Sequence, residues 1–272
     1  GGIQMLAKLL KYDFKSLLKY WWIAAISSVG LSILGGSCIT LINTERELPS
    51  VVYVTATFGI LATVLGMSAF MILTSIIIFV RYYKNFFTDE GYLTFTLPVK
   101  KGQLLNSKLI SSVVIMNLSM IILFLDLFLM LAIGLAKQIF TAEFFEGLSQ
   151  FFEALNDEFG FYLIPLSLEL IAVFVISSIF STLFLYMCIT FASIIAKRAK
   201  VIVAIGIYYG ASTIFSFATE IFYLFGLNSL IVWFSSLPEQ SLKLITVVVL
   251  FGIIVLLATA CMILYTIVYH ML

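Results

Sequence analysis

Long apolar runs alternate with short polar segments along the whole chain. Each run is at least as long as the roughly 20 helical residues needed to cross the hydrocarbon core of a membrane. The runs occupy residues 21–42, 51–80, 109–136, 161–196, 201–225 and 244–269. This pattern predicts an all-α polytopic membrane protein with six transmembrane helices, organised as a single transmembrane domain over residues 5–272.

The first polar segment, residues 5–20, predicts a basic amphipathic helix lying in the membrane interface. Lysines occupy one face of this helix and apolar residues occupy the other. The lysines are Lys8, Lys11, Lys15 and Lys19. Trp21 and Trp22 are expected to mark the point where the chain turns into the membrane.

Two further polar segments, residues 137–160 and 226–243, are expected on the outer side of the membrane. In residues 137–160, phenylalanines and leucines recur at helical spacing, opposite five carboxylates between Glu143 and Glu158. This spacing predicts an acidic amphipathic helix, or a pair of helices, on the outer surface. Residues 226–243 contain Pro238 and could fold as a re-entrant hairpin before the last span.

The polar segment between the second and third spans, residues 81–108, predicts a short amphipathic helix. Thr88 can cap this helix, and Asp89 and Glu90 suit its opening turn, because carboxylates favour the positive end of the helix dipole. The apolar side consists of Tyr92, Leu93, Phe95 and Leu97, Pro98 ends the helix, and Lys100, Lys101 and Lys108 follow. Such a helix offers a rigid surface to a protein partner, or lies on anionic lipid as an interfacial loop helix.

The distribution of charge predicts the orientation of the spans. The chain is 62% hydrophobic and 11% charged, which excludes a soluble domain. All but three of its 15 Lys and Arg residues fall on one side of the predicted membrane, the exceptions being Arg46, Lys137 and Lys243. Because basic residues gather on the cytoplasmic side, both termini are expected in the cytoplasm.

Few residues could carry chemistry. Cys38, Cys188 and Cys261 lie singly in apolar runs, which predicts neither a disulfide nor a metal site. The sequence contains no phosphate-binding loop and no hydrolase motif, so catalysis is not expected in this chain. The four residues before Met5 are expected not to be native, and the native chain is expected to continue past Leu272.

Two carboxylates, Asp126 and Glu169, fall inside predicted spans. An ionised carboxylate there costs about 3 kcal/mol on insertion scales, so each should face a cavity or a partner, or remain protonated. Either residue could line a pathway for a proton or for the cationic part of a substrate. Alternatively, each is a neutral carboxyl hydrogen-bonded between helices. Glu220 is expected at the outer rim of the fifth span, with a pathway exit as the alternative.

The sequence of the segment at residues 81–108 resembles a cytoplasmic signature. Glu90-Gly91-Tyr92-Leu93, then Leu97-Pro98-Val99-Lys100, then Lys108 at the start of an apolar helix, are similar to the pattern of ABC-type exporter permeases of the second type. That family commonly has Thr in place of Tyr92 and Ser in place of Lys100. These departures resemble a branch typical of low-GC Gram-positive bacteria.

The resemblance implies a permease subunit in a bacterial plasma membrane. In that family the segment is a coupling helix seated on a cytoplasmic ABC ATPase subunit, which holds the ATP and Mg²⁺, and residues 5–20 would be the connecting helix beside it. Two permeases, identical or sister chains, would form a dimer surrounded by membrane lipid, and no nucleic-acid partner is expected. The likeness also implies export of an amphiphile such as an antimicrobial peptide, a drug or a lipid. Pathway candidates on the second and fifth helices are Thr63, Met67, Tyr209, Thr213 and Ser216.

Two small-residue faces predict close helix packing. Gly206 and Gly210 form one face on the fifth span, and Ala62, Gly66 and Ala69 form the other on the second span. Each could pack within one subunit or between subunits.

Two other functions remain open from the sequence. The chain could be a proton-coupled secondary transporter that uses Asp126 and Glu169. It could also be a non-transporting sensor or scaffold subunit whose outer acidic helix binds a ligand.

Overall fold

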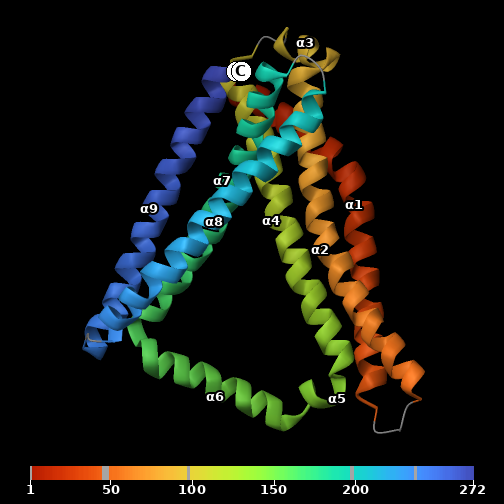
Figure 1. Cartoon of the computed structure of the whole chain (residues 1–272), viewed down its shortest axis with the longest axis vertical. Helices are drawn as coiled ribbons and strands as arrows, with labels where there is room; N and C mark the ends of the chain where they lie inside the picture. The colour runs from red at the N-terminus through yellow and green to blue at the C-terminus, as the bar shows by residue number, and fades with distance from the viewer. Residues whose placement is uncertain (1, 45–48, 97–98, 197–198, 236–237) are drawn as a thin grey trace. The chain divides into compact units, whose positions relative to one another are not determined.

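The computed structural model describes residues 2–44, 49–96, 99–196, 199–235 and 238–272, and every regular element in these ranges is helical (Figure 1). The long helices are α1 (Gly2–Ile42), α2 (Ser50–Phe87), α4 (Lys101–Gly134), α7 (Leu163–Ile195), α8 (Lys200–Ser235) and α9 (Glu239–Met271). The shorter elements are α3 (Asp89–Phe95), α5 (Ala136–Ile139), α6 (Ala142–Phe159) and a 3-10 turn, η1 (Gly160–Tyr162). Six helices in the described residues are long and apolar enough to cross a membrane. The predicted all-α architecture with six candidate spans is therefore confirmed.

The N-terminal part of α1 differs from the prediction. A separate interfacial helix over residues 5–20 would need a turn at Trp21, whereas α1 continues without interruption from Gly2 to Ile42. Between Lys8 and Trp22 the sequence contains no glycine or proline, the two residues that most strongly destabilise a helix interior. The lysine-bearing segment is consequently an extension of the first candidate span.

The chain between the last two spans also differs from the prediction. α8 continues to Ser235 and α9 begins at Glu239, so the re-entrant hairpin predicted over residues 226–243 is wrong. Pro238 occupies the N-cap of α9 with φ −61° and ψ 142°, which is extended backbone. The proline therefore marks the start of α9, and residues 226–235 continue the preceding helix.

The chain folds as two compact units. The first contains Gly1–Asn85 and Leu93–Ala154, and the second contains Phe86–Tyr92 and Leu155–Leu272. In the first unit α1 lies along α4, and in the second unit α7 packs against α8 and α9.

In the first unit, α1 and α4 run parallel and approach closely. Trp21 Nε1 donates to Ser119 Oγ over 2.7 Å. Further along both helices, a Cβ added to Gly36 would lie 2.9 Å from the carbonyl oxygen of Met130. Small and hydroxylated residues let membrane helices approach in this way. The distance between α1 and α4 therefore depends on the small size of the residues in their contact.

Among the described residues of the second unit, α7 supplies most of the buried side chains. These include Leu183, Tyr186, Cys188 and Ile189. α9 contacts α7 near Cys261, whose sulfur lies 3.8 Å from the carbonyl oxygen of Ile176. Near the other end of α9, Lys243 Nζ lies 3.1 Å from Glu158 Oε1.

The two predicted small-residue faces have different surroundings. A Cβ added to Gly66 would lie 2.5 Å from Leu31 Cδ1 of α1, whereas Ala62 and Ala69 on the same face of α2 are exposed. A Cβ added to Gly206 or Gly210 would meet nothing within 4 Å among the described residues. The face on α8 is therefore open.

Candidate functional site

The segment between α2 and α3 forms a tight corner. α2 ends at Phe87 and α3 begins at Asp89, so Thr88 alone connects the two helices. The amide of Gly91 donates to the carbonyl oxygen of Thr88 over 2.7 Å. A Cβ at Gly91 would lie 2.7 Å from the carbonyl oxygen of Phe86, so glycine is required by this close approach of backbone.

Polar side chains at this corner are exposed. Thr88, Asp89 and Glu90 are exposed, and Tyr92 has 76% of its surface accessible. α3 begins at Asp89, where the charge pattern predicts a helix start. Leu97 and Pro98, and the side chain of Leu93, lie outside the described residues. Lys100 is exposed and precedes α4, where its amide lies 3.3 Å from Gln103 Oε1.

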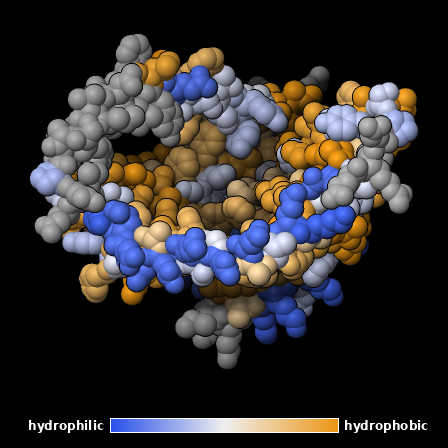
Figure 2. Space-filling view, turned by 90° about the horizontal axis from the view of Figure 1, so that it is seen from below, coloured by the Kyte–Doolittle hydropathy of each residue, from blue (hydrophilic) through white to orange (hydrophobic). Residues whose placement is uncertain are grey.

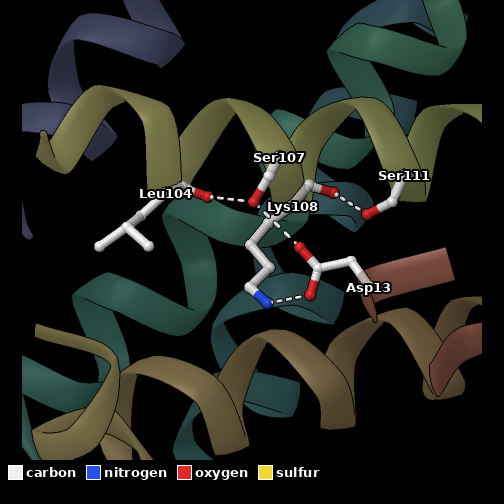
Figure 3. Close-up of polar contacts among 5 residues, drawn as sticks. All are labelled: Asp13, Leu104, Ser107, Lys108 and Ser111. Carbon is white, nitrogen blue, oxygen red and sulfur yellow. Dashed lines mark hydrogen bonds and ion pairs between the residues drawn. The ribbon is translucent and has the colours of Figure 1, made fainter. Parts of the chain in front are cut away.

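A buried ionic cluster joins the first part of α1 to the first part of α4 (Figure 3). Asp13 is 3% exposed and Lys108 is 8% exposed, and the ammonium of Lys108 forms an ion pair with Asp13 Oδ1. Ser107 Oγ lies 2.9 Å from the other carboxylate oxygen of Asp13 and 3.0 Å from the carbonyl oxygen of Leu104. Ser111 Oγ donates to the carbonyl oxygen of Lys108 over 3.0 Å. Both carboxylate oxygens of Asp13 are therefore partnered on α4.

One feature of the sequence could have predicted this cluster. Asp13 is the single acidic residue among the four lysines of residues 5–20, and it precedes Leu17 by four positions. That spacing places a carboxylate on the apolar face of the helix. A buried carboxylate needs a cationic or hydrogen-bonding partner, and Lys108, at the start of an apolar run, is available.

A second buried polar group joins three helices of the first unit. Ser119 of α4 accepts the indole hydrogen bond of Trp21 and lies 3.1 Å from Thr74 Oγ1 of α2. All three side chains are at most 2% exposed. Trp21 was expected at the membrane interface, but it is buried between helices because a small hydroxylated residue on α4 can accept its N–H.

Asp126 lies deep in the same unit. It is 1% exposed, and the Ser28 hydroxyl of α1 is beside its carboxyl group. The Ser28 hydroxyl donates to the carbonyl oxygen of Ala25 over 2.9 Å. The Oδ2 atom of Asp126 has no hydrogen-bond partner among the described residues. Thr63 and Met67, the two pathway candidates on α2, are also buried in this unit, at 4% and 2% exposed.

The remaining pathway candidates belong to the second unit. Glu169 of α7 is half-buried, and its Oε2 atom has no hydrogen-bond partner among the described residues. Four residues recur along α8 at intervals of four, three and four positions, which places them on one helical face. They are Tyr209, Thr213, Ser216 and Glu220, and all four are exposed. We call these four residues the polar face of α8.

The amphipathic segment predicted over residues 137–160 contains a single long helix, α6, preceded by the short α5. Seven apolar side chains lie within an arc of about 120° when each residue turns the helix by about 100°. They are Phe144, Phe145, Leu148, Phe151, Phe152, Leu155 and Phe159. No residue of α6 is buried by the described chain. In Figure 2, hydrophilic residues form a band across the face that is seen from below.

The described residues contain no group of three or more His, Cys, Asp or Glu side chains that could hold a metal ion. Comparisons of the chain with family models, with curated proteins and with solved structures find no match.

Proposed function

We propose that this chain is the transmembrane permease subunit of an ATP-driven ABC exporter in a bacterial plasma membrane, with both termini in the cytoplasm. The observation that carries the proposal is α3, a short helix with exposed polar residues between the second and third candidate spans. Its sequence resembles the coupling segment of exporter permeases, and its position along the chain is the one that such a segment occupies.

The tight corner gives α3 a mechanical role in this proposal. One residue, Thr88, separates α3 from α2, and Gly91 packs against the backbone of Phe86. A helix fixed in this way would pass its own movement to α2. ATP and Mg²⁺ would bind to separate ATPase subunits, and closure of those subunits would press on Asp89, Glu90 and Tyr92.

The ionic cluster extends this relay. α4 begins at Lys101, shortly after α3, and the ion pair between Lys108 and Asp13 joins α4 to α1. The N-terminal part of α1, although continuous with the first span, would still act as the connecting segment beside α3. Movement of α3 would consequently reach the two candidate spans α4 and α1 together.

The polar face of α8 supports a second permease chain and a shared pathway. Polar side chains inside a candidate span are unfavourable against lipid, so they tend to face a partner helix or a water-filled space. Gly206 and Gly210 leave room beside this face for close approach of another helix. A second copy or a sister chain would cover it, and the enclosed space would pass an amphiphile outward.

A pulldown from native membranes tests the proposal. The parent chain is expected to co-purify with an ATPase that carries a phosphate-binding loop, and the double variant Glu90→Lys with Leu93→Asp is expected to lose it. The double variant Glu153→Lys with Asn156→Asp makes the same charge changes on the polar side of α6 and should retain the ATPase. Absence of an ATPase from the parent, or its full retention by the first variant, would refute the proposal.

The buried carboxyl of Asp126 favours a second candidate function, that of a proton-coupled transporter. Its Oδ2 atom has no partner among the described residues, which suits a group that gains and loses a proton. This candidate predicts substrate flux by the purified chain in vesicles without any ATPase, driven by a pH gradient and abolished by Asp126→Asn. Flux that requires ATP and an ATPase subunit would exclude it.

A further inference from the structure

The four lysines at the start of α1 form one continuous exposed face. Lys8, Lys11, Lys15 and Lys19 are separated by three, four and four positions, so they lie within an arc of about 80° on an α-helix. All four are exposed. None of them forms an ion pair within the described part of the chain. We call these four residues the lysine face.

The opposite side of the same helical turns is fixed to the first unit. Asp13, Leu17 and Trp21 are each at most 3% exposed, and Asp13 and Trp21 bond to residues of α4. Lys15 follows Asp13 by two positions and Lys19 follows Leu17 by two, which is a rotation of about 200° around the helix. The lysine face therefore points away from the helices of its own unit.

The lysine face continues into an apolar stripe on the same side of α1. Trp22, Ile26 and Ile33 follow Lys19 along this side, and they are 55%, 67% and 48% exposed. Lys19 Nζ also lies 5.5 Å above the ring of Tyr20, which is 60% exposed. Aromatic side chains commonly mark the boundary between headgroups and acyl chains. One side of α1 thus presents, in order, cationic groups, an aromatic boundary and an apolar surface.

We propose that this side of α1 binds anionic phospholipids of the cytoplasmic leaflet, with their phosphates at Lys15 and Lys19 and an acyl chain along Ile26 and Ile33. A phospholipid has the same order of parts as the stripe, with a charged phosphate above apolar chains. The positive charge of the two lysines selects anionic headgroups over zwitterionic ones, because each lysine near an anionic membrane surface adds to the attraction.

The length of the lysine face determines which of its lysines can reach the lipid headgroups. Helical rise places Lys15 and Lys19 about 6 Å apart, and places Lys8 about 16 Å from Lys19. The headgroup layer of one leaflet is about 5–8 Å thick. Because α1 is continuous with a candidate span, Lys15 and Lys19 fit within this layer beside Trp22. Lys8 and Lys11 lie farther out and serve as a matched control pair on the same face.

Fluorescence quenching in nanodiscs tests the proposal on the full chain. Trp21→Phe and Trp233→Phe leave Trp22 as the single tryptophan, which reports on the lipid next to the lysine face. Brominated phosphatidylglycerol and brominated phosphatidylcholine are compared as quenchers at equal mole fraction. Phosphatidylglycerol is expected to be enriched beside Trp22 by about fivefold or more, since one lysine contributes about that factor.

The lysine variants decide the outcome. In the double variant Lys15→Gln with Lys19→Gln, the two lipids are expected to quench Trp22 about equally. The double variant Lys8→Gln with Lys11→Gln should keep most of the preference for phosphatidylglycerol. Equal quenching by the two lipids beside the parent lysine face would overturn the proposal, and so would an unchanged preference in the Lys15 and Lys19 variant. Inorganic phosphate, added as a competitor, should leave the preference unchanged.

A second measurement uses the chain with all three of its tryptophans unchanged. Native mass spectrometry counts the phosphatidylglycerol molecules that remain bound to the detergent-purified chain. Fewer retained molecules in the Lys15 and Lys19 variant than in the Lys8 and Lys11 variant would support the site, and equal numbers would overturn it. Neither measurement involves an ATPase, so the result is independent of the proposed transport function.

Discussion

Asp13 and Lys108, which are 95 positions apart in the chain, form a buried ion pair between α1 and α4 (Figure 3). Ser107 completes the cluster by contacting the second carboxylate oxygen of Asp13. A buried charge is unfavourable when its partner is removed, so the three side chains depend on one another. The pair therefore fixes the register of the two parallel helices near their N-terminal ends.

Single substitutions of this pair are expected to destabilise the first unit strongly. Asp13→Leu or Lys108→Met alone leaves one buried charge without its partner, which typically costs about 3–5 kcal/mol in the free energy of unfolding. The double variant replaces both charges by apolar side chains and should be more stable than either single variant. Thermal unfolding of the detergent-purified proteins, compared in a double-mutant cycle, measures this coupling. Strictly additive effects would contradict the ion pair.

The close approach of α1 and α4 can be tested by adding one methyl group. Gly36→Ala would bring a Cβ to 2.9 Å from the carbonyl oxygen of Met130, so the helices must separate, at a cost of about 1–3 kcal/mol. Gly30→Ala is the matched control on the same helix, because its Cβ meets nothing within 4 Å. The control should be neutral or slightly stabilising, since alanine favours helix. Equal melting temperatures of the two variants would argue against the observed packing.

The amphipathic pattern of α6 predicts an interfacial helix, and hence a difference between two nearby positions. Glu153 lies in the acidic arc and Leu155 lies in the apolar arc, about 200° away around the helix. In a background without the native cysteines, Glu153→Cys should react with a membrane-impermeant maleimide at least about tenfold faster than Leu155→Cys, because a thiol in the acyl region is shielded and stays protonated. Labelling of intact cells also reports the side of the membrane. Equal rates at the two positions would contradict an interfacial helix.

The open small-residue face on α8 predicts contact between two copies of this chain. Gly210→Cys is expected to form a disulfide between chains on mild oxidation of membranes, because glycine at this position leaves room for close approach. Gly30→Cys on the exposed side of α1 is the control and should remain monomeric. If oxidation crosslinks both variants to the same extent, random collision explains the result and the face is not an interface.

Much of the architecture follows from the sequence because the membrane constrains it so strongly. Apolar runs of sufficient length must become spans, and Asp89 and Glu90 favour a helix start where α3 is found. The amphipathic pattern of residues 137–160 likewise indicates a helix, and α6 occupies most of that range. These signals are local, so they can be recognised without knowing which helices are neighbours.

The contacts between helices could not be predicted from such local signals. Trp21 is typical of an interfacial residue by composition, yet it is buried because Ser119, 98 positions later, accepts its hydrogen bond. The spacing of Asp13 and Leu17 indicates a carboxylate on the apolar face, but the sequence does not identify Lys108 and Ser107 as its partners. Partner choice between apolar helices depends on matched shape and a few polar pairs, which a single sequence does not reveal.

The parallel contact of α1 with α4 has a consequence for biogenesis. The ribosome completes the α1 side of the contact first, and the residues that meet it on α4 are made 95 positions later at Lys108 and 98 positions later at Ser119. At translation rates of about 5–20 residues per second, this interval lasts roughly 5–20 s. During it, the buried face of α1 enters the membrane without its partner. The first helix must therefore remain close to the insertion machinery, or be shielded there, until the third span arrives.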